Sequence, residues 1–189
     1  MIRICIVGEI ASGKTFVSNC FGYPIFNADK EVIKIYKKSR KCFNQLKKKF
    51  PNNINRFPIK KSQIKKILNQ KNIKSLSNIV HPYVRLSLKK FLKKHKKRKF
   101  VVLDIPLLIE NKLYLKSDIL IYVNTPKYII NKRLKKRGTY NKQIIKILES
   151  QQLKKIKKKK FCNFVIENAT DRNNIIKQIK FIKKKIYDW

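Results

Sequence analysis

The chain has 189 residues, four cysteines and a formal net charge of +39 at pH 7, from 49 lysines and arginines against 10 acidic residues. Its length suits one compact α/β domain with an inserted helical lobe. No apolar run reaches the roughly 20 residues that cross a bilayer, and no signal peptide is apparent. The cysteines lack metal-binding spacing, so we expect reduced thiols in a cytoplasmic protein without a membrane partner.

The basic residues are mostly lysines, and they run through nearly every surface segment. Recognition of nucleic acid favours an arginine stripe with interleaved aromatic residues, and the sequence has none. We therefore expect a lysine-covered surface without a specific nucleic-acid site, although salt-sensitive binding to polyanions should occur. The same positive field would speed the arrival of an anionic substrate.

The first predicted strand, Arg3–Val7, leads into residues 8–15, which read G-E-I-A-S-G-K-T. This is a phosphate-binding loop in its required context of strand, loop and helix. Gly8 and Gly13 permit backbone conformations that let successive N–H groups converge on phosphate oxygens at a helix N-terminus. Lys14 can reach the β- and γ-phosphates, and the Thr15 hydroxyl can bind Mg²⁺.

Asp29 comes at the end of the second predicted strand, Pro24–Asn27. Ligands bind at the carboxyl ends of parallel strands, where a carboxylate can orient or deprotonate an attacking hydroxyl. Asp29 could equally be the N-cap of a helix beginning at Lys30, and its position alone leaves both readings open.

The segment between Asp29 and Phe100 shows helical periodicity and no convincing strand. The periodic stretches are Val32–Phe50, Ser62–Leu68 and Ile73–Lys97. About seventy residues is too long for an ordinary crossover, so we expect residues 30–97 to form a helical lobe for the second substrate. Within it, Pro82 suits the first turn of a helix. His81 alone is more often structural than catalytic, and Arg85 could point at an anionic ligand.

The third predicted strand, Phe100–Ile105, carries Asp104 after four apolar residues. This resembles the second acidic motif of phosphate-loop enzymes, which binds Mg²⁺ directly or through water. Glu110 could orient a substrate group or only cap the next helix. Two further predicted strands, Ile119–Asn124 and Phe164–Glu167, complete the pattern. Strands and helices alternate, which predicts a three-layer α/β fold with a five-stranded parallel sheet.

Residues 132–160 are dense in lysine and follow a helix that starts after Pro126. A second helix is expected over about Lys142–Ile156, with the turn at Gly138 and Thr139. The pair could be a solvated hairpin or a lid over a nucleotide. Arg133 and Arg137 favour the lid, because arginine suits bidentate phosphate contact. The sheet-bearing core would then comprise residues 1–29, 98–131 and 161–189.

The chain lacks the D-x-x-G and N-K-x-D motifs of regulatory GTPases, and it is too small for a motor or transporter ATPase. A small kinase is the natural interpretation. The ordered motifs resemble the dephospho-coenzyme A kinase family over nearly the whole chain. They are G-E-I-A-S-G-K-T, N-A-D, H-P-Y-V-R, D-I-P-L-L-I-E, an R-x-x-x-R segment with Gln151 after it, and V-I-E-N.

The resemblance implies transfer of the ATP γ-phosphate to the 3′-hydroxyl of dephospho-CoA, with Mg²⁺ as cofactor. It implies that Asp29 is the catalytic base, assisted by Lys14 and Arg137. ATP binding would fall to Gly8, Ala11, Ser12, Gly13, Lys14, Thr15, Phe16, Arg137 and Asn168. Substrate binding would fall to His81, Arg85, Pro106, Leu107 and Glu110, and metal binding to Thr15 and Asp104. We expect a monomer; the alternatives are another small-metabolite or nucleoside monophosphate kinase, or a nucleic-acid-binding ATPase.

Three positions depart from the family pattern. Asn27 replaces the first aspartate of D-A-D, which removes a charge but keeps the expected base. Ala11 replaces a loop glycine, a small change if φ there is negative. Glu9 replaces another glycine and brings a carboxylate near phosphate, which is tolerable only if its side chain points away.

Overall fold

The computed structural model describes residues 1–136, 142–169 and 171–187. The chain divides into two compact units, Met1–Asn27 with Lys97–Trp189 and Ala28–Lys96, which we name the core unit and the helical unit. None of the described helices is long and apolar enough to cross a membrane.

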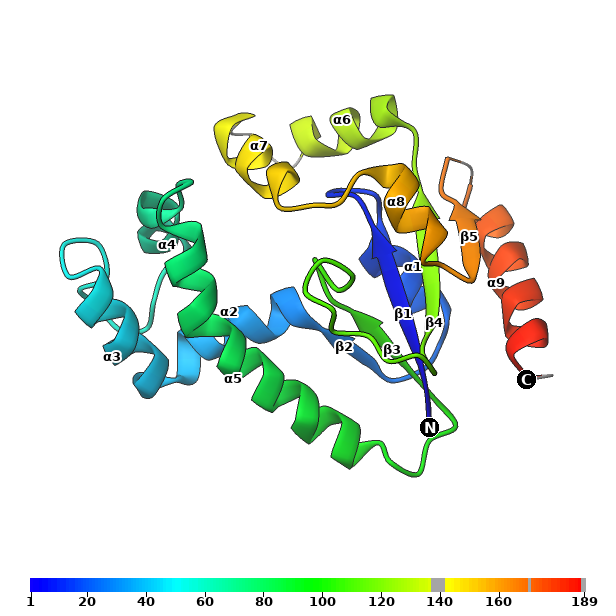
Figure 1. The fold of residues 1–189 in the computed structure, drawn as a ribbon, viewed down its shortest axis with the longest axis horizontal. Helices are drawn as coiled ribbons and strands as arrows, with labels where there is room; N and C mark the ends of the chain where they lie inside the picture. Colours follow the sequence, from blue (N-terminus) through cyan, green and yellow to red (C-terminus); the bar gives the residue numbers. More distant parts are fainter. Residues whose placement is uncertain (137–141, 170, 188–189) are drawn as a thin grey trace. The chain divides into compact units, whose positions relative to one another are not determined.

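The core unit contains a parallel sheet with the strand order β2-β3-β1-β4-β5 (Figure 1). The strands are β1 Ile2–Gly8, β2 Ile25–Asn27, β3 Phe100–Asp104, β4 Ile119–Asn124 and β5 Phe164–Glu167. β3 and β4 are buried almost without interruption, as expected for a parallel sheet covered on both faces. The five-stranded fold predicted from the sequence is thereby confirmed, with strand bounds within two residues.

The described helices of the core unit are α1 Lys14–Cys20, α6 Lys127–Lys136, α7 Lys142–Ser150, α8 Lys155–Lys160 and α9 Arg172–Tyr187. Of these, α1, α8 and α9 contact strands of the sheet. α1 and α9 share one apolar cluster with the sheet, in which Ile4 and Ile6 pack with Val17 and Ile179. α8 also contacts β1. Successive side chains of a strand point to opposite faces of a sheet, so one strand can contact helices on both faces.

The expected helix over Lys142–Ile156 is in fact two helices, α7 and α8. The backbone at Lys154 is extended, with φ −56° and ψ 142°. The preceding Leu153 N–H donates to Glu110 Oε1 at 3.0 Å. A side chain 43 positions earlier therefore takes a backbone donor out of the helical pattern, and the helix is interrupted.

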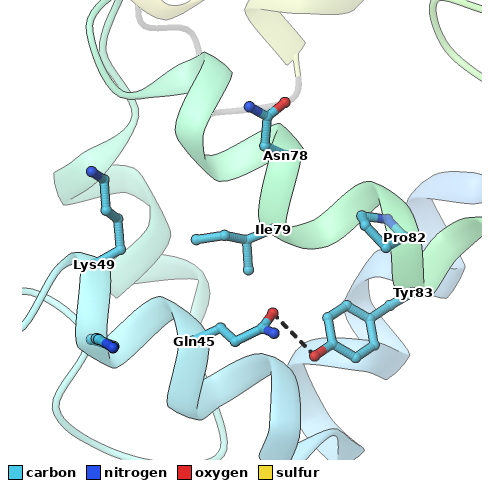
Figure 2. Close-up of a pocket in the computed structure, with 7 residues that line it drawn as sticks. Gln45, Lys49, Asn78, Ile79, Pro82 and Tyr83 are labelled. Carbon is cyan, nitrogen blue, oxygen red and sulfur yellow. Dashed lines mark hydrogen bonds between the residues drawn. The ribbon is translucent and has the colours of Figure 1, made fainter.

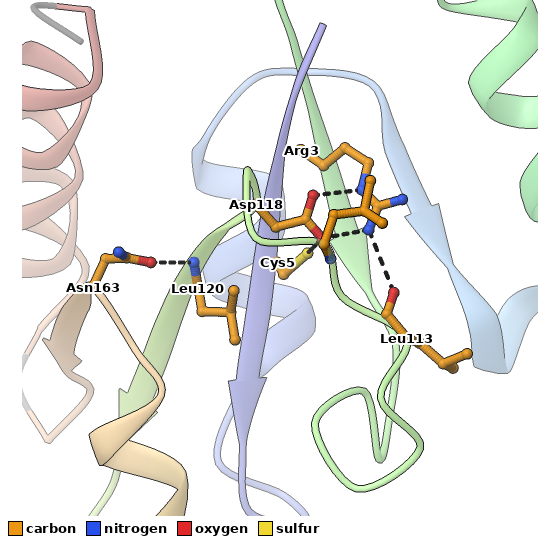
Figure 3. Close-up of polar contacts among 7 residues, drawn as sticks. Arg3, Cys5, Leu113, Asp118, Leu120 and Asn163 are labelled. Carbon is orange, nitrogen blue, oxygen red and sulfur yellow. Dashed lines mark hydrogen bonds and ion pairs between the residues drawn. The ribbon is translucent and has the colours of Figure 1, made fainter.

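A buried polar network lies around Asp118, just before β4 (Figure 3). The Arg3 guanidinium pairs with the Asp118 carboxylate and also donates to the Leu113 carbonyl at 3.3 Å. The Leu115 N–H donates to Asp118 at 2.8 Å. Burial, and then the Asp118 charge, raise the pKa of the neighbouring Cys5 thiol well above its usual value. This network ties the amino-terminal end of β1 to the loop that leads into β4.

The helical unit consists of α2 Ala28–Lys38, α3 Arg40–Lys49, α4 Lys61–Ile67 and α5 Ile73–Lys94. The periodic stretch Val32–Phe50 forms two helices, because the Ser39 hydroxyl accepts the Cys42 N–H at 3.2 Å and starts a new one. Leu46, Ile67 and other apolar residues of these helices form a separate core.

Pro82 lies inside α5 and does not begin a helix as the sequence had suggested. An interior proline removes one backbone hydrogen bond. Here Leu76 and Val80, on the turns before it, are buried in the apolar core of the helical unit. Packing therefore carries the helix through a residue that local propensity treats as a start signal.

Candidate functional site

The phosphate loop connects β1 to α1 at the carboxyl edge of the sheet. Gly13 is the N-cap of α1 and has a left-handed φ of 90°. A Cβ atom at Gly13 would lie 2.4 Å from the Asn168 amide nitrogen, and one at Gly8 would lie 2.9 Å from the Val123 carbonyl. Gly8 is therefore favoured by a close backbone neighbour, and Gly13 by the Asn168 side chain and by its left-handed conformation.

Ala11 has a φ of 59°, so the negative value that would make its replacement of glycine a small change is not found. A left-handed backbone costs a side-chain-bearing residue of order 1 kcal/mol. Its methyl group is buried against Ile130 and Leu134, which offsets part of that cost. The departure at position 11 thus exchanges backbone strain for contact with α6.

Lys14 lies with its ammonium over the loop backbone. Its Nζ donates to the Glu9 carbonyl at 2.8 Å and to the Gly8 carbonyl at 3.2 Å. These neutral acceptors hold the charge next to the loop, where a phosphate group would be a stronger partner.

Thr15, Asp104 and Asn27 meet where β1, β2 and β3 end. The Thr15 hydroxyl donates to Asp104 Oδ2 at 2.6 Å, and the Asn27 amide donates to the same oxygen at 2.6 Å. Asn27 and Asp104 are register partners on adjacent strands, which explains the contact. A buried carboxylate beside a hydroxyl is an oxygen donor set that suits Mg²⁺, which keeps several water ligands. The described residues hold no cluster of three or more His, Cys, Asp or Glu side chains that could bind a metal.

Asn168 and Arg133 both contact the phosphate loop at Ser12. The Asn168 amide donates to the Ser12 carbonyl at 2.6 Å, and Arg133 Nη1 donates to the same oxygen at 3.0 Å. The Thr125 hydroxyl is a further donor to it, at 2.8 Å. No sequence motif indicates Thr125, because a threonine after a strand is common; only its burial and its contact with Ser12 in the fold distinguish it.

A cavity of about 480 Å³ lies beside the loop in the core unit. It is lined by Glu9, Ile10, Thr125, Lys127, Ile130, Asn131, Glu149, Gln152, Leu153, Lys154 and Lys155. Burial, and then the charge of Glu9, raise the pKa of Tyr122. Glu9, whose carboxylate departs from the family pattern, lines this cavity together with residues of α6 and the start of α8.

Glu110 forms an ion pair with Lys158 of α8 at 2.8 Å, and both side chains are largely buried. It also accepts the Leu153 N–H. In this structure Glu110 anchors α8. The sequence had suggested only that it orients a substrate group or caps the next helix. Pro106 and Leu107 precede it in a turn, and Leu107 has a φ of 57°.

In the helical unit, His81 and Arg85 are one turn apart on α5. Burial, and then the Arg85 charge, lower the pKa of His81. The helical unit also holds a cavity of about 610 Å³ between α3 and α5, which neither His81 nor Arg85 lines (Figure 2). It is lined by Gln45, Lys48, Lys49, Asn78, Ile79, Pro82 and Tyr83, and the Tyr83 hydroxyl donates to Gln45 at 3.1 Å. Most of its lining surface is apolar, with amide and ammonium groups among it.

The remaining predicted residues occupy varied places. Asp29 lies in the first turn of α2, which begins at Ala28, so it is neither the end of a strand nor the cap of a helix from Lys30. Phe16 lies in α1 with an exposed side chain. Arg137, with the expected turn at Gly138 and Thr139, lies outside the described residues.

Comparison with known proteins identifies close sequence relatives. A family model described as dephospho-CoA kinase matches residues 2–174. The dephospho-CoA kinase of Wolbachia pipientis wMel is 32% identical over 186 residues, which covers 95% of each chain. The dephospho-CoA kinase of Bartonella henselae is 30% identical over 190 residues and covers 97% of each chain.

Solved structures share the fold. TT1252 from Thermus thermophilus has a TM-score of 0.78 and 23% identity, covering 99% of this chain and 97% of that one. The dephospho-CoA kinase from Campylobacter jejuni has a TM-score of 0.61 and 24% identity, covering 97% and 96%. These similarities confirm the expected phosphate-loop kinase architecture.

Proposed function

This chain belongs to the dephospho-CoA kinase family of ATP-dependent transferases, and from that premise we propose how its residues divide the work of phosphoryl transfer. One observation carries the proposal. The glycine loop, Lys14 and the Thr15–Asp104 pair meet at the carboxyl edge of a parallel sheet, where such folds bind nucleotides. Phosphoryl transfer depends mainly on positioning and on stabilisation of charge, and these residues suit both tasks.

Gly8, Ala11, Ser12, Gly13 and Phe16 would provide the loop and helix backbone for the ATP phosphates. Lys14 would move from the loop carbonyls to the β- and γ-phosphates, because a phosphate oxygen is a stronger acceptor for an ammonium. Arg137 would add a bidentate contact, and Asn168 would lie toward the adenine side. The family pattern supports the last two roles.

Thr15 and Asp104 would hold Mg²⁺, as the hydroxyl–carboxylate contact at 2.6 Å supports. When bound, the ion would neutralise charge on the β- and γ-phosphate oxygens. Asn27 would keep one Asp104 oxygen oriented without adding a second negative charge.

Asp29 would accept the proton of the attacking ribose hydroxyl. Its support is the N-A-D pattern and its place two residues beyond the end of β2. His81 and Arg85 of the helical unit, with Pro106, Leu107 and Glu110 of the core unit, would contribute to the binding of dephospho-CoA. Residues 30–97 would then be the acceptor lobe and residues 132–160 the lid.

The direct test is a reaction of the purified protein with ATP, Mg²⁺ and dephospho-CoA, followed by mass measurement. The acceptor should gain one phosphoryl group and reach the mass of coenzyme A. Lys14→Ala should lower the rate by a factor on the order of a hundred or more, because it removes transition-state charge stabilisation. Lys177→Ala removes the same charge from the exposed face of α9 and should leave the rate unchanged.

Phosphorylation of another acceptor without any coenzyme A would contradict the substrate assignment. The comparisons do not favour the alternatives, another small-metabolite or nucleoside monophosphate kinase or a nucleic-acid-binding ATPase. The monomeric state, the cytoplasmic location and the absence of a specific nucleic-acid site stay predictions.

A further inference from the structure

The carbonyl oxygen of Ser12 accepts hydrogen bonds from three side chains that come from separate segments. They are Thr125 directly after β4, at 2.8 Å, Arg133 in α6, at 3.0 Å, and Asn168 directly after β5, at 2.6 Å. Their convergence on one backbone atom fixes the phosphate loop to both strands on that side of the sheet.

These donors exceed what the carbonyl needs. A backbone oxygen has two lone pairs, so two donors would satisfy it. Thr125 and Asn168 are each only 2% exposed, and the fold commits two buried polar side chains and a guanidinium to the same acceptor. Satisfying a buried carbonyl is therefore not a sufficient explanation for the cluster.

The peptide that carries this oxygen also carries the N–H of Gly13. The Ser12–Gly13 bond is trans, so its C=O and N–H point in opposite directions. Holding the carbonyl against Thr125, Arg133 and Asn168 turns the Gly13 N–H to the other side of the loop. Hydrogen bonds to a carbonyl also polarise the amide and strengthen its N–H as a donor.

We propose that Thr125, Arg133 and Asn168 are positioning residues that orient and polarise the Gly13 N–H for a nucleotide phosphate. The proposal rests on the proposed binding of nucleotide by the loop. It adds Thr125 to the functional residues. It also gives Arg133 and Asn168 a role through the backbone, whatever direct contacts they make with the nucleotide.

The Gly13 amide can be observed by itself. The chain has four glycines, and the Ser12–Gly13 pair is its one Ser-Gly sequence. Labelling serine carbonyl carbons with ¹³C and glycine nitrogens with ¹⁵N therefore marks this single peptide in an NMR spectrum. Addition of ADP should move the Gly13 N–H signal downfield in the wild-type protein, because the amide donates to a phosphate oxygen.

Thr125→Val removes the hydroxyl with little change of shape, and Thr125→Ser keeps the hydroxyl. The valine variant should show a smaller ADP-induced shift, and its ADP dissociation constant and KM for ATP should rise about three- to tenfold. The serine variant should restore all three quantities. The KM for dephospho-CoA should not change in either variant, because the loop peptide does not bind the acceptor.

Asn163→Ala is the matched control. Asn163 accepts the Leu120 N–H at 2.9 Å at the other end of β4 (Figure 3). Its loss should lower the melting temperature, as that of Thr125→Val should, without changing the Gly13 shift. If Thr125→Val does not fold, Arg133→Met is measured in its place, since it keeps a long side chain and removes the donor to the Ser12 carbonyl.

A wild-type ADP shift that persists undiminished in Thr125→Val, or in the Arg133→Met replacement, would overturn this proposal and leave the proposed function standing. A wild-type protein whose Gly13 signal does not respond to ADP would overturn both. Failure of dephospho-CoA as acceptor would leave this result intact, because the NMR and ADP measurements use nucleotide alone.

Discussion

At the scale of single residues, Asp29 is the proposed base. Asp29→Asn should lower kcat by about a hundredfold or more, because the amide cannot accept the hydroxyl proton, while ATP binding survives. Steady-state kinetics and nucleotide titration measure the two quantities. Glu31→Gln, which changes the next acidic residue on α2, is the control and should be near normal. A fully active Asp29→Asn enzyme would exclude Asp29 as the base.

Asn27 contacts the proposed metal-binding carboxylate. Asn27→Asp would place a second carboxylate at hydrogen-bonding distance from Asp104, and the two charges would repel without a cation. The variant should therefore melt at a lower temperature than the wild type in EDTA and gain more thermal stability from Mg²⁺. Asn27→Ala lacks the added charge and should show no enhanced response. Equal Mg²⁺-induced shifts in all three proteins would argue against metal binding beside Asp104.

Ala11 and Ala28 are a matched pair, each 7% exposed. Ala28 is buried at the start of α2, so Ala28→Gly should lower the free energy of unfolding by about 1 kcal/mol, through loss of its buried methyl group and through backbone entropy. Ala11 has a φ of 59°, so Ala11→Gly should relieve strain, and the change should stay within about 0.5 kcal/mol. Urea denaturation checks both. Equal losses would mean that left-handed strain at position 11 is negligible.

At the scale of elements, Glu110 fastens α8 to the turn that follows β3. Lys158 is only 2% exposed, so Glu110→Gln would leave its ammonium buried without a counter-charge. We expect a loss of about 3 kcal/mol in the free energy of unfolding. Glu31→Gln breaks a pair whose lysine is largely exposed and should cost less than about 1 kcal/mol. Denaturation curves of the two variants compare a buried with an exposed pair.

A small loss in Glu110→Gln would show that Lys158 reaches water when its partner is removed.

Local sequence patterns predicted the helices of this region but not the break between α7 and α8. The break between α7 and α8 depends on a contact between Leu153 and a side chain 43 positions away. The course of α5 through Pro82 depends likewise on the core of the helical unit. A window of local residues contains neither piece of information.

At the scale of the whole molecule, the buried Cys42 and the partly buried Cys162 should make the folded state less stable at high pH. Burial raises the pKa of Cys42 from its ordinary value of 9.0 to about 11 and that of Cys162 to about 12. Both thiols therefore stay neutral in the folded protein at a pH where they ionise in the unfolded chain. Their stabilising contribution is complete below pH 9 and is lost as pH rises toward 11 or 12.

The wild-type protein should thus lose more free energy of unfolding between about pH 8 and about pH 10.5 than Cys42→Ala does. Titration of the many lysines contributes to both proteins, so the difference isolates the thiol. Denaturation curves at the two pH values give this difference. Identical losses would show that Cys42 ionises equally in the folded and unfolded states.

The sequence by itself determined the five strands, the glycine loop and the kinase family. Runs such as Phe100–Asp104 are apolar throughout and suit a strand buried on both faces, and a phosphate loop needs its residues in consecutive order. The tertiary structure alone decided which side chains hold that loop and which anchor α8. Thr125 meets Ser12 across 113 positions, and Asn168 meets it across 156. Such partners become neighbours only when parallel strands bring their carboxyl ends to one edge of the sheet, so no local pattern can reveal them.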